Sequence, residues 1–212
     1  MTTFQIFRLL LKNALRFQYL KHTGKPGRPQ AVSLEVTHDC VARCVMCNIW
    51  KISDDVVNLS VPQWIELLSS ELFVDIRELD LTGGEPFIRE DLTDLFYSIC
   101  DLKNTNLPAL RSIAVTTNGL LTKRVITTVE KILPAFEKEG IDLVVVCALD
   151  AVGELHDRVR NFPGAWSKVS DTIEALSLLR EKTPNLIVGL KTTILPLNID
   201  ELSRISSFAQ DN

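Results

Sequence analysis

The chain has 212 residues, of which 46% are hydrophobic, and it carries a formal net charge of −4 at pH 7. A chain of this length can bury one sizeable core, and its slightly acidic balance gives no reason to expect a nucleic-acid partner. No apolar run is long enough to span a bilayer and no signal-peptide pattern is present, so we expect a cytoplasmic protein.

A basic amphipathic helix is predicted over residues 4–20, and a linker containing Gly and Pro follows it up to residue 30. Arg8, Lys12 and Arg16 recur at i, i+4 spacing beside apolar side chains such as Phe7 and Leu11. Such a helix can make weak contact with a membrane surface or dock on an acidic partner. It can also pack on the domain as a leader helix with its basic stripe in water, which is the interpretation we prefer.

From residue 31 onward, short apolar segments alternate with longer amphipathic ones. Strands are predicted at 32–37, 78–82, 112–117, 143–149 and 187–194, and helices at 61–72, 90–101, 122–139, 166–182 and from 199 onward. The strands are mostly apolar without strict alternation, which is typical of parallel strands buried on both faces. The repeated βα pattern predicts an α/β fold in which a parallel sheet curves into a partial TIM-type barrel.

Three of the five cysteines, Cys40, Cys44 and Cys47, follow the first predicted strand in one short loop. Without a signal peptide, this grouping indicates metal or catalytic use rather than a disulfide framework. Three thiolate ligands leave one iron of an iron–sulfur cluster open, whereas four would close every iron site. A zinc site that includes His38 and a redox pair made by Cys44 and Cys47 stay open as alternatives. Cys100 and Cys147 are expected in the core.

The next strands also end in polar or glycine-rich motifs. These motifs are Thr82-Gly-Gly-Glu-Pro86, Thr116-Thr-Asn-Gly119 and Ala148-Leu-Asp150. Because the carboxyl ends of parallel strands meet on one face of the sheet, we expect all of them to border one pocket. The pair His156-Asp157 after the fourth strand is expected to serve as a helix cap and ion-pair partner rather than as an acid–base pair.

CxxxCxxC after a first strand and GGEP after a second resemble the radical S-adenosylmethionine (SAM) superfamily, in particular its molybdenum-cofactor-enzyme-like and SPASM-type branch. The likeness runs from about residue 31 to the end of the chain and includes Asn118, Asp150 and Arg160. It implies a radical SAM core over residues 31–212, preceded by the helix and linker of residues 1–30. The resemblance also implies a barrel of six βα units, of which about five are present, so the core is expected to be incomplete at its C-terminus.

The resemblance implies a mechanism as well. Cys40, Cys44 and Cys47 would hold a 4Fe–4S cluster whose open iron binds SAM, and an electron donor such as a flavodoxin or ferredoxin would reduce it. SAM would then be cleaved to a 5′-deoxyadenosyl radical that abstracts hydrogen from an unidentified peptide, lipid or small molecule. Further cofactor-binding residues carried over from the family motifs are Met46, Gly83, Gly84, Glu85, Asn118 and Asp150.

Two further expectations follow. A Cβ at Gly84 would intrude on SAM, so Gly84→Val is expected to weaken SAM binding while sparing the cluster. The strand at 187–194 would form an unprotected edge, which favours self-association. The alternative function is a truncated, catalytically silent domain that binds an iron–sulfur cluster, SAM or a partner.

Overall fold

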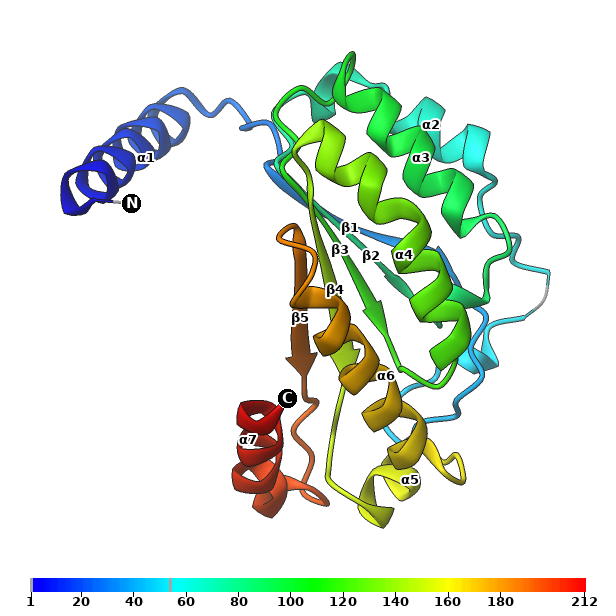
Figure 1. The fold of residues 1–212 in the computed structure, drawn as a ribbon. Helices are drawn as coiled ribbons and strands as arrows, with labels where there is room; N and C mark the ends of the chain where they lie inside the picture. Colours follow the sequence, from blue (N-terminus) through cyan, green and yellow to red (C-terminus); the bar gives the residue numbers. More distant parts are fainter. Residues whose placement is uncertain (1, 54) are drawn as a thin grey trace.

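Five parallel strands form one open sheet in the computed structural model, which describes residues 2–53 and 55–212 (Figure 1). The strands lie side by side in chain order: β1 (Ala31–Thr37), β2 (Glu78–Gly83), β3 (Ser112–Thr117), β4 (Asp142–Ala148) and β5 (Leu186–Lys191). The helices are α1 (Thr3–Thr23), α2 (Val61–Leu68), α3 (Leu92–Lys103), α4 (Thr122–Glu139), α5 (Glu154–Arg160), α6 (Ala165–Arg180) and α7 (Leu202–Asp211). The predicted α/β fold, a partial barrel of parallel βα units, is confirmed.

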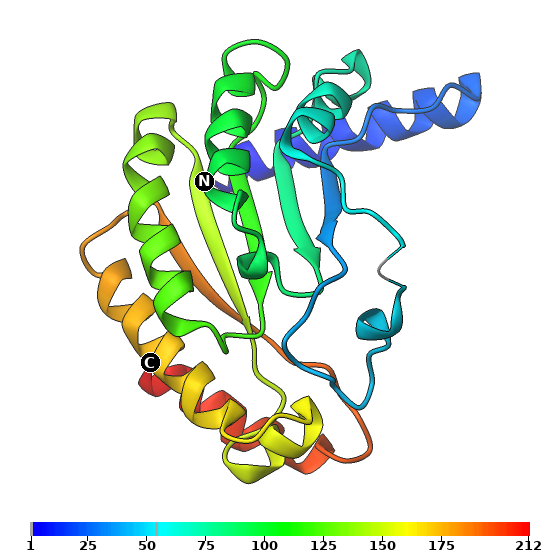
Figure 2. The same ribbon diagram turned by 90° about the vertical axis from the view of Figure 1, so that its right-hand side faces the viewer.

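The helices α2, α3, α4 and α6 lie on the same face of the sheet (Figures 1 and 2). Side chains on this face are fully buried, among them Ile113 and Val115 of β3 and Leu143 and Val145 of β4. The residues between them, such as Ala114, are only half-buried. The expectation of strands buried on both faces is therefore wrong, because the second face lines the open interior of the barrel.

Helix α2, predicted at 61–72, is shorter than expected and ends at Leu68. Two serines offer the backbone alternative hydrogen bonds there: the Ser69 hydroxyl donates to the Ile65 carbonyl at 2.7 Å, and the Ser70 hydroxyl accepts from the Leu72 N–H at 3.3 Å. Such local bonds compete with helix continuation, so residues 71–73 form a separate 3₁₀ turn.

Helix α5 was not predicted, because two turns are too short to show a helical period. It lies between Gly153 and Asn161, which both have positive φ, at 82° and 49°. Its Asp157 accepts hydrogen bonds from the N–H groups of Gly164 and Trp166 at 2.7 Å each. These donors belong to the start of α6, so the expected capping role of Asp157 is confirmed.

Helix α1 projects away from the sheet and its helices (Figures 1 and 2). None of the residues Thr3–Thr23 is buried, and only Arg16 and Leu20 are half-buried. Among the residues that the structure describes, one ion pair joins the helix to the domain, between Arg16 and Asp75 at 3.8 Å, and both side chains are substantially exposed. The preferred interpretation of a leader helix packed on the domain is therefore wrong. No helix within residues 2–53 and 55–212 is both long and apolar enough to cross a membrane.

Strand β5 forms one edge of the sheet, and its Ile187 is 47% exposed. After this strand the chain turns into α7, which packs through Phe208 against Trp166 of α6, with ring centroids 5.1 Å apart in an edge-to-face arrangement. Ile205 of the same helix is buried. Self-association through the β5 edge stays a prediction.

Candidate active site

A cavity of about 370 Å³ opens where the carboxyl ends of the strands converge. Volumes of this size are typical of sites for small molecules and cofactors. The strand-end motifs therefore do border one pocket, as the sequence predicted. Its walls are formed by Cys40, Cys44, Met46, Cys47, Ile49, Thr82, Gly83, Gly84, Thr116, Thr117, Asn118, Ala148, Arg160, Lys191 and Thr193.

The three clustered cysteines all face this cavity. Cys44 is buried, while Cys40 and Cys47 are half-buried, and all three are free thiols. Burial raises the pKa of both Cys40 and Cys44; for Cys44 the Arg160 guanidinium opposes this shift. Cys100 and Cys147, in contrast, are buried in the core, and burial raises the pKa of each to about 12.

Two side chains donate hydrogen bonds to these sulfurs. Arg160 reaches Cys44 Sγ through Nη1 at 3.7 Å, and Asn118 reaches Cys40 Sγ through Nδ2, also at 3.7 Å. The donors come from different parts of the chain, since Asn118 follows β3 and Arg160 is the last residue of α5. Polar donors of this kind stabilise the thiolate form that a metal centre requires.

The end of β2 is pressed against the beginning of the cysteine loop. The Gly84 N–H donates to the Thr37 carbonyl and the Glu85 N–H to the Asp39 carbonyl, both at 2.7 Å. A Cβ at Gly84 would collide with the backbone of His38 and Asp39. The expectation that this Cβ would intrude on SAM is corrected here, because the side-chain direction at Gly84 points into the backbone of the cysteine loop.

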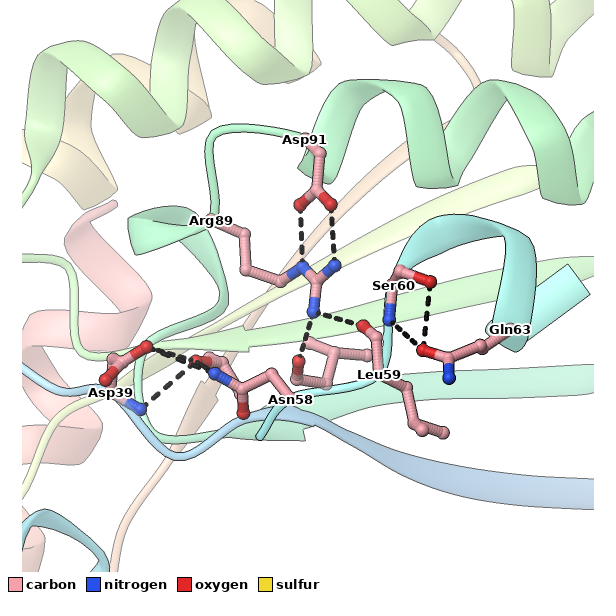
Figure 3. A network of polar contacts seen from close by, with 9 residues as sticks. Asp39, Asn58, Leu59, Ser60, Gln63, Arg89 and Asp91 are labelled. Atoms are coloured by element: carbon pink, nitrogen blue, oxygen red, sulfur yellow. Dashed lines mark hydrogen bonds and ion pairs between the residues drawn. The ribbon is translucent and has the colours of Figure 1, made fainter. Parts of the chain in front are cut away.

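A clamp of polar contacts fixes both ends of the segment 37–59 that carries the cysteines (Figure 3). Arg89 pairs with both carboxylate oxygens of Asp91, at 2.8 and 2.9 Å, and its Nη1 donates to the carbonyls of Val36 at 2.6 Å and Leu59 at 3.0 Å. Asn58 closes the segment from within by accepting from the His38 N–H at 3.0 Å. This clamp could not be predicted from the sequence, because its partners lie up to 53 residues apart.

Glu85 is fully buried and does not line the cavity. Its carboxylate accepts from the Thr117 hydroxyl at 2.8 Å, the Asn118 N–H at 2.7 Å and the Phe87 N–H at 3.2 Å. Burial raises its pKa to about 7, although these hydrogen bonds oppose the shift. In this structure Glu85 joins the end of β2 to the end of β3 and fixes the backbone of Asn118.

Asp150 is also fully buried, and its carboxylate pairs with Arg160 at 2.7 Å. It further accepts from the Thr193 N–H at 2.8 Å. Burial raises the pKa of Asp150, and Arg160 opposes this. Behind the pair, His156 Nδ1 accepts from the Asp150 N–H at 3.2 Å, and burial followed by the nearby Arg160 charge lowers the pKa of His156 to about 4. His156 is thus neutral near pH 7.

The arrangement of Cys40, Cys44 and Cys47 can be compared with the needs of a single metal ion and of a multi-iron cluster. Within residues 2–53 and 55–212, no three Cys, His, Asp or Glu side chains converge as ligands of a single metal ion. The three thiols instead face one roomy cavity from which polar donors reach two of the sulfurs. A multi-iron cluster spreads its cysteine ligands more widely than one ion does, so these residues fit such a cluster better than a mononuclear site.

Comparison with known proteins gives a consistent result. The model of the radical SAM superfamily matches residues 34–209. The chain is 25% identical over 184 residues to a PqqA peptide cyclase of Granulibacter bethesdensis, which is 86% of this chain and 44% of that protein. It is 32% identical over 91 residues to a probable GTP 3′,8-cyclase of Archaeoglobus fulgidus, which is 43% of this chain and 28% of that protein.

Among solved structures, SuiB of Streptococcus suis matches with a TM-score of 0.65 and 14% identity, over 97% of this chain and 42% of SuiB. SuiB bound to S-adenosylmethionine gives 0.63 and 16%, over 95% of this chain and 43% of SuiB. At such identity the likeness shows the fold. The chain spans less than half the length of each of these relatives. Since the family match runs from β1 into α7, the chain belongs to the radical SAM superfamily, whose members use a 4Fe–4S cluster and S-adenosylmethionine.

Proposed function

We propose that the chain is a radical SAM enzyme in which Cys40, Cys44 and Cys47 hold the 4Fe–4S cluster and SAM occupies the rest of the same cavity. The observation that carries this proposal is that all three thiols share one cavity of about 370 Å³ with the backbone of Gly83 and Gly84. When bound, the reduced cluster supplies the electron that cleaves SAM and generates the 5′-deoxyadenosyl radical that takes hydrogen from a substrate. A flavodoxin or ferredoxin is the proposed donor.

Arg160 and Asn118 serve this centre as positioning residues. Each donates a hydrogen bond to one cysteine sulfur, and N–H donors near a cluster raise its reduction potential by stabilising added negative charge. Asp150 aims the Arg160 guanidinium through the 2.7 Å ion pair, and Glu85 fixes Asn118 through the backbone N–H. The two carboxylates therefore act on the cofactors through their neighbours.

The remaining cavity wall suits a ligand with both polar and apolar parts. Met46 and Ile49 form an apolar side next to the cysteines, and Met46 is the proposed neighbour of the adenine. The side chains of Thr82 and Thr116 at the ends of β2 and β3 offer hydroxyl groups. Gly83 and Gly84 offer only backbone, which leaves the space between the strand ends free for SAM.

The test is anaerobic reconstitution of the chain with iron and sulfide, followed by reduction and an assay for 5′-deoxyadenosine. We expect about four irons per chain and SAM-dependent formation of 5′-deoxyadenosine. Cys40→Ala, Cys44→Ala and Cys47→Ala should each abolish both. Cys100→Ala, which removes a thiol buried in α3, is the matched control and should retain both.

Two other outcomes have clear meanings. Stoichiometric zinc with no uptake of iron would contradict the cluster assignment. A cluster that binds SAM without forming 5′-deoxyadenosine would instead identify the chain as a catalytically silent cofactor-binding domain.

A further inference from the structure

Helix α1 carries a broad apolar face that no residue within 24–53 and 55–212 covers. At 100° per residue, eight apolar side chains fall within roughly half of the helix circumference, interrupted by Gln18 and, near the two ends of the helix, by Thr3, Lys21 and His22. The large ones among them are well exposed: Phe7 and Leu10 at 62%, and Phe17 at 63%. The apolar face consists of Phe4, Ile6, Phe7, Leu10, Leu11, Ala14, Leu15 and Phe17.

The helix touches the domain with its other side. Arg16 and Leu20, the only half-buried residues of the helix, lie about 180° and about 140° around the helix from Phe7. Leu20 lies close to Gly27 of the linker, and Arg16 faces Asp75. The exposed apolar face is therefore turned away from the described domain rather than toward it.

Charge distinguishes this part of the chain from the rest. Six basic residues and no acidic one precede Glu35, whereas the remainder carries the excess of acidic residues that makes the whole chain −4. Two of the cations, Arg8 and Lys12, lie beside one border of the apolar face, and Arg16 continues their i, i+4 row onto the opposite side of the helix. Cations at the border of an apolar face lie at the depth where lipid phosphates lie when a helix rests in a membrane interface.

We propose that α1 is an interfacial anchor that lies in the surface of an anionic lipid bilayer. Its apolar face enters the boundary of the acyl chains, and Arg8 and Lys12 contact phosphates. A helix that docks in a protein groove presents a few anchors along one narrow stripe, whereas this apolar face covers about half of the helix. The helix does not meet the length and hydropathy of a membrane span, so it rests on the surface rather than crossing it.

The charge difference also gives the anchor an orientation. An anionic surface attracts residues 1–34, which we call the basic head, and repels the acidic remainder of the chain. The linker of residues 24–30 allows the domain to stand off from the surface, because it contains no regular helix or strand and adds Lys25 and Arg28 to the basic head.

The test is flotation of the reconstituted 212-residue chain with vesicles of phosphatidylcholine alone or with 30% phosphatidylglycerol. We expect binding to the anionic vesicles that weakens at high salt. Removing cations in Arg8→Gln/Lys12→Gln should lower affinity by roughly 25-fold, since each basic residue near an anionic surface contributes about fivefold. Phe7→Ser/Leu11→Ser should lower it at least about tenfold. The matched control Leu72→Ser/Leu178→Ser, with two exposed leucines of the domain, should bind as the parent chain does.

Folding does not confound this test, because α1 contributes no buried side chain and the variants should keep the thermal midpoint of the parent. The proposal is overturned if the chain fails to float with anionic vesicles or binds neutral ones equally well. It is also overturned if Phe7→Ser/Leu11→Ser leaves vesicle binding unchanged. Reversible dimerisation that this variant abolishes, without vesicle binding, would show that a second copy covers the face.

Discussion

Glu85 and Asp150 are the two buried carboxylates beside the cavity, and they are held in opposite ways. Glu85 accepts hydrogen bonds only from neutral groups, and burial raises its pKa to about 7. Asp150 faces the Arg160 guanidinium at 2.7 Å, which opposes the effect of burial. One side of the cavity, formed by Gly83, Gly84 and Asn118, is therefore held by the neutral hydrogen bonds of Glu85. The other side, formed by Arg160, is held by the buried ion pair with Asp150.

Neither carboxylate reaches the cavity itself. Glu85 fixes the Asn118 backbone next to the Gly83–Gly84 turn, while Asp150 orients Arg160 toward Cys44. Glu85 and Asp150, which the family motifs mark as cofactor-binding, thus support in this structure the residues that line the cavity.

On the Glu85 side of the cavity, the largest loss of stability is expected from a substitution at Gly84. A Cβ there meets the carbonyls of the cysteine loop, so Gly84→Val should lower the free energy of unfolding by about 4 kcal/mol or more. Cluster content should fall together with SAM binding. Gly189→Ala is the matched control, because its Cβ would meet only Val146 at an ordinary 3.8 Å. Chemical denaturation and iron analysis measure both effects; a stable Gly84→Val chain with a full cluster would contradict the tight fit.

On the Asp150 side of the cavity, the largest loss of stability is expected from removing the ion pair between Asp150 and Arg160. Arg160→Leu leaves a buried carboxylate without its cation, which should cost about 3 to 5 kcal/mol of unfolding free energy. Asp150→Asn/Arg160→Leu removes both charges and should recover part of that loss. If the double variant were as unstable as Arg160→Leu, the contact with Cys44 rather than the ion pair would dominate.

The free energy of unfolding should also depend on pH through Glu85, whose pKa burial raises to about 7. Because the folded pKa of Glu85, about 7, lies above its ordinary 4.5, the unfolded chain releases this proton first as the pH rises. The protonated carboxyl therefore favours the folded state at low pH, and that contribution should fall by about 3 kcal/mol between pH 4.5 and pH 8. In Glu85→Gln this part of the slope should disappear. Equal slopes in parent and variant would show that Glu85 stays ionised in the fold.

Asn118→Ala should give the smallest effect. It removes the hydrogen bond to Cys40 Sγ, worth about 1 kcal/mol, and should lower the reduction potential of the bound cluster by on the order of 40 mV. A potentiometric titration followed by electron paramagnetic resonance measures the shift. An unchanged potential would mean that the amide does not reach the cluster ligand.

Much of this arrangement could be predicted from the sequence. The apolar segments gave the five strands, and the glycine-rich or polar motifs after them gave the cavity, because parallel strands end at one edge. The contacts of Arg89 with Val36 and Leu59 could not be predicted, because they join positions far apart that follow no spacing rule.

The orientation of Gly84 and the exposure of α1 also escaped prediction. A sequence shows that a glycine is present but not which atoms its missing side chain would meet. It likewise shows that Phe7 and Leu11 share a face but not whether a domain covers that face.

Whether Cys40, Cys44 and Cys47 hold a 4Fe–4S cluster with an open iron can be read from the electron paramagnetic resonance spectrum of the reconstituted, reduced chain, recorded with and without SAM. We expect a 4Fe–4S signal that SAM perturbs, because three cysteine ligands leave one iron open. The signal should vanish in each of Cys40→Ala, Cys44→Ala and Cys47→Ala and persist in Cys100→Ala. A signal that ignores SAM, or that survives the loss of any one of the three cavity cysteines, would contradict the account.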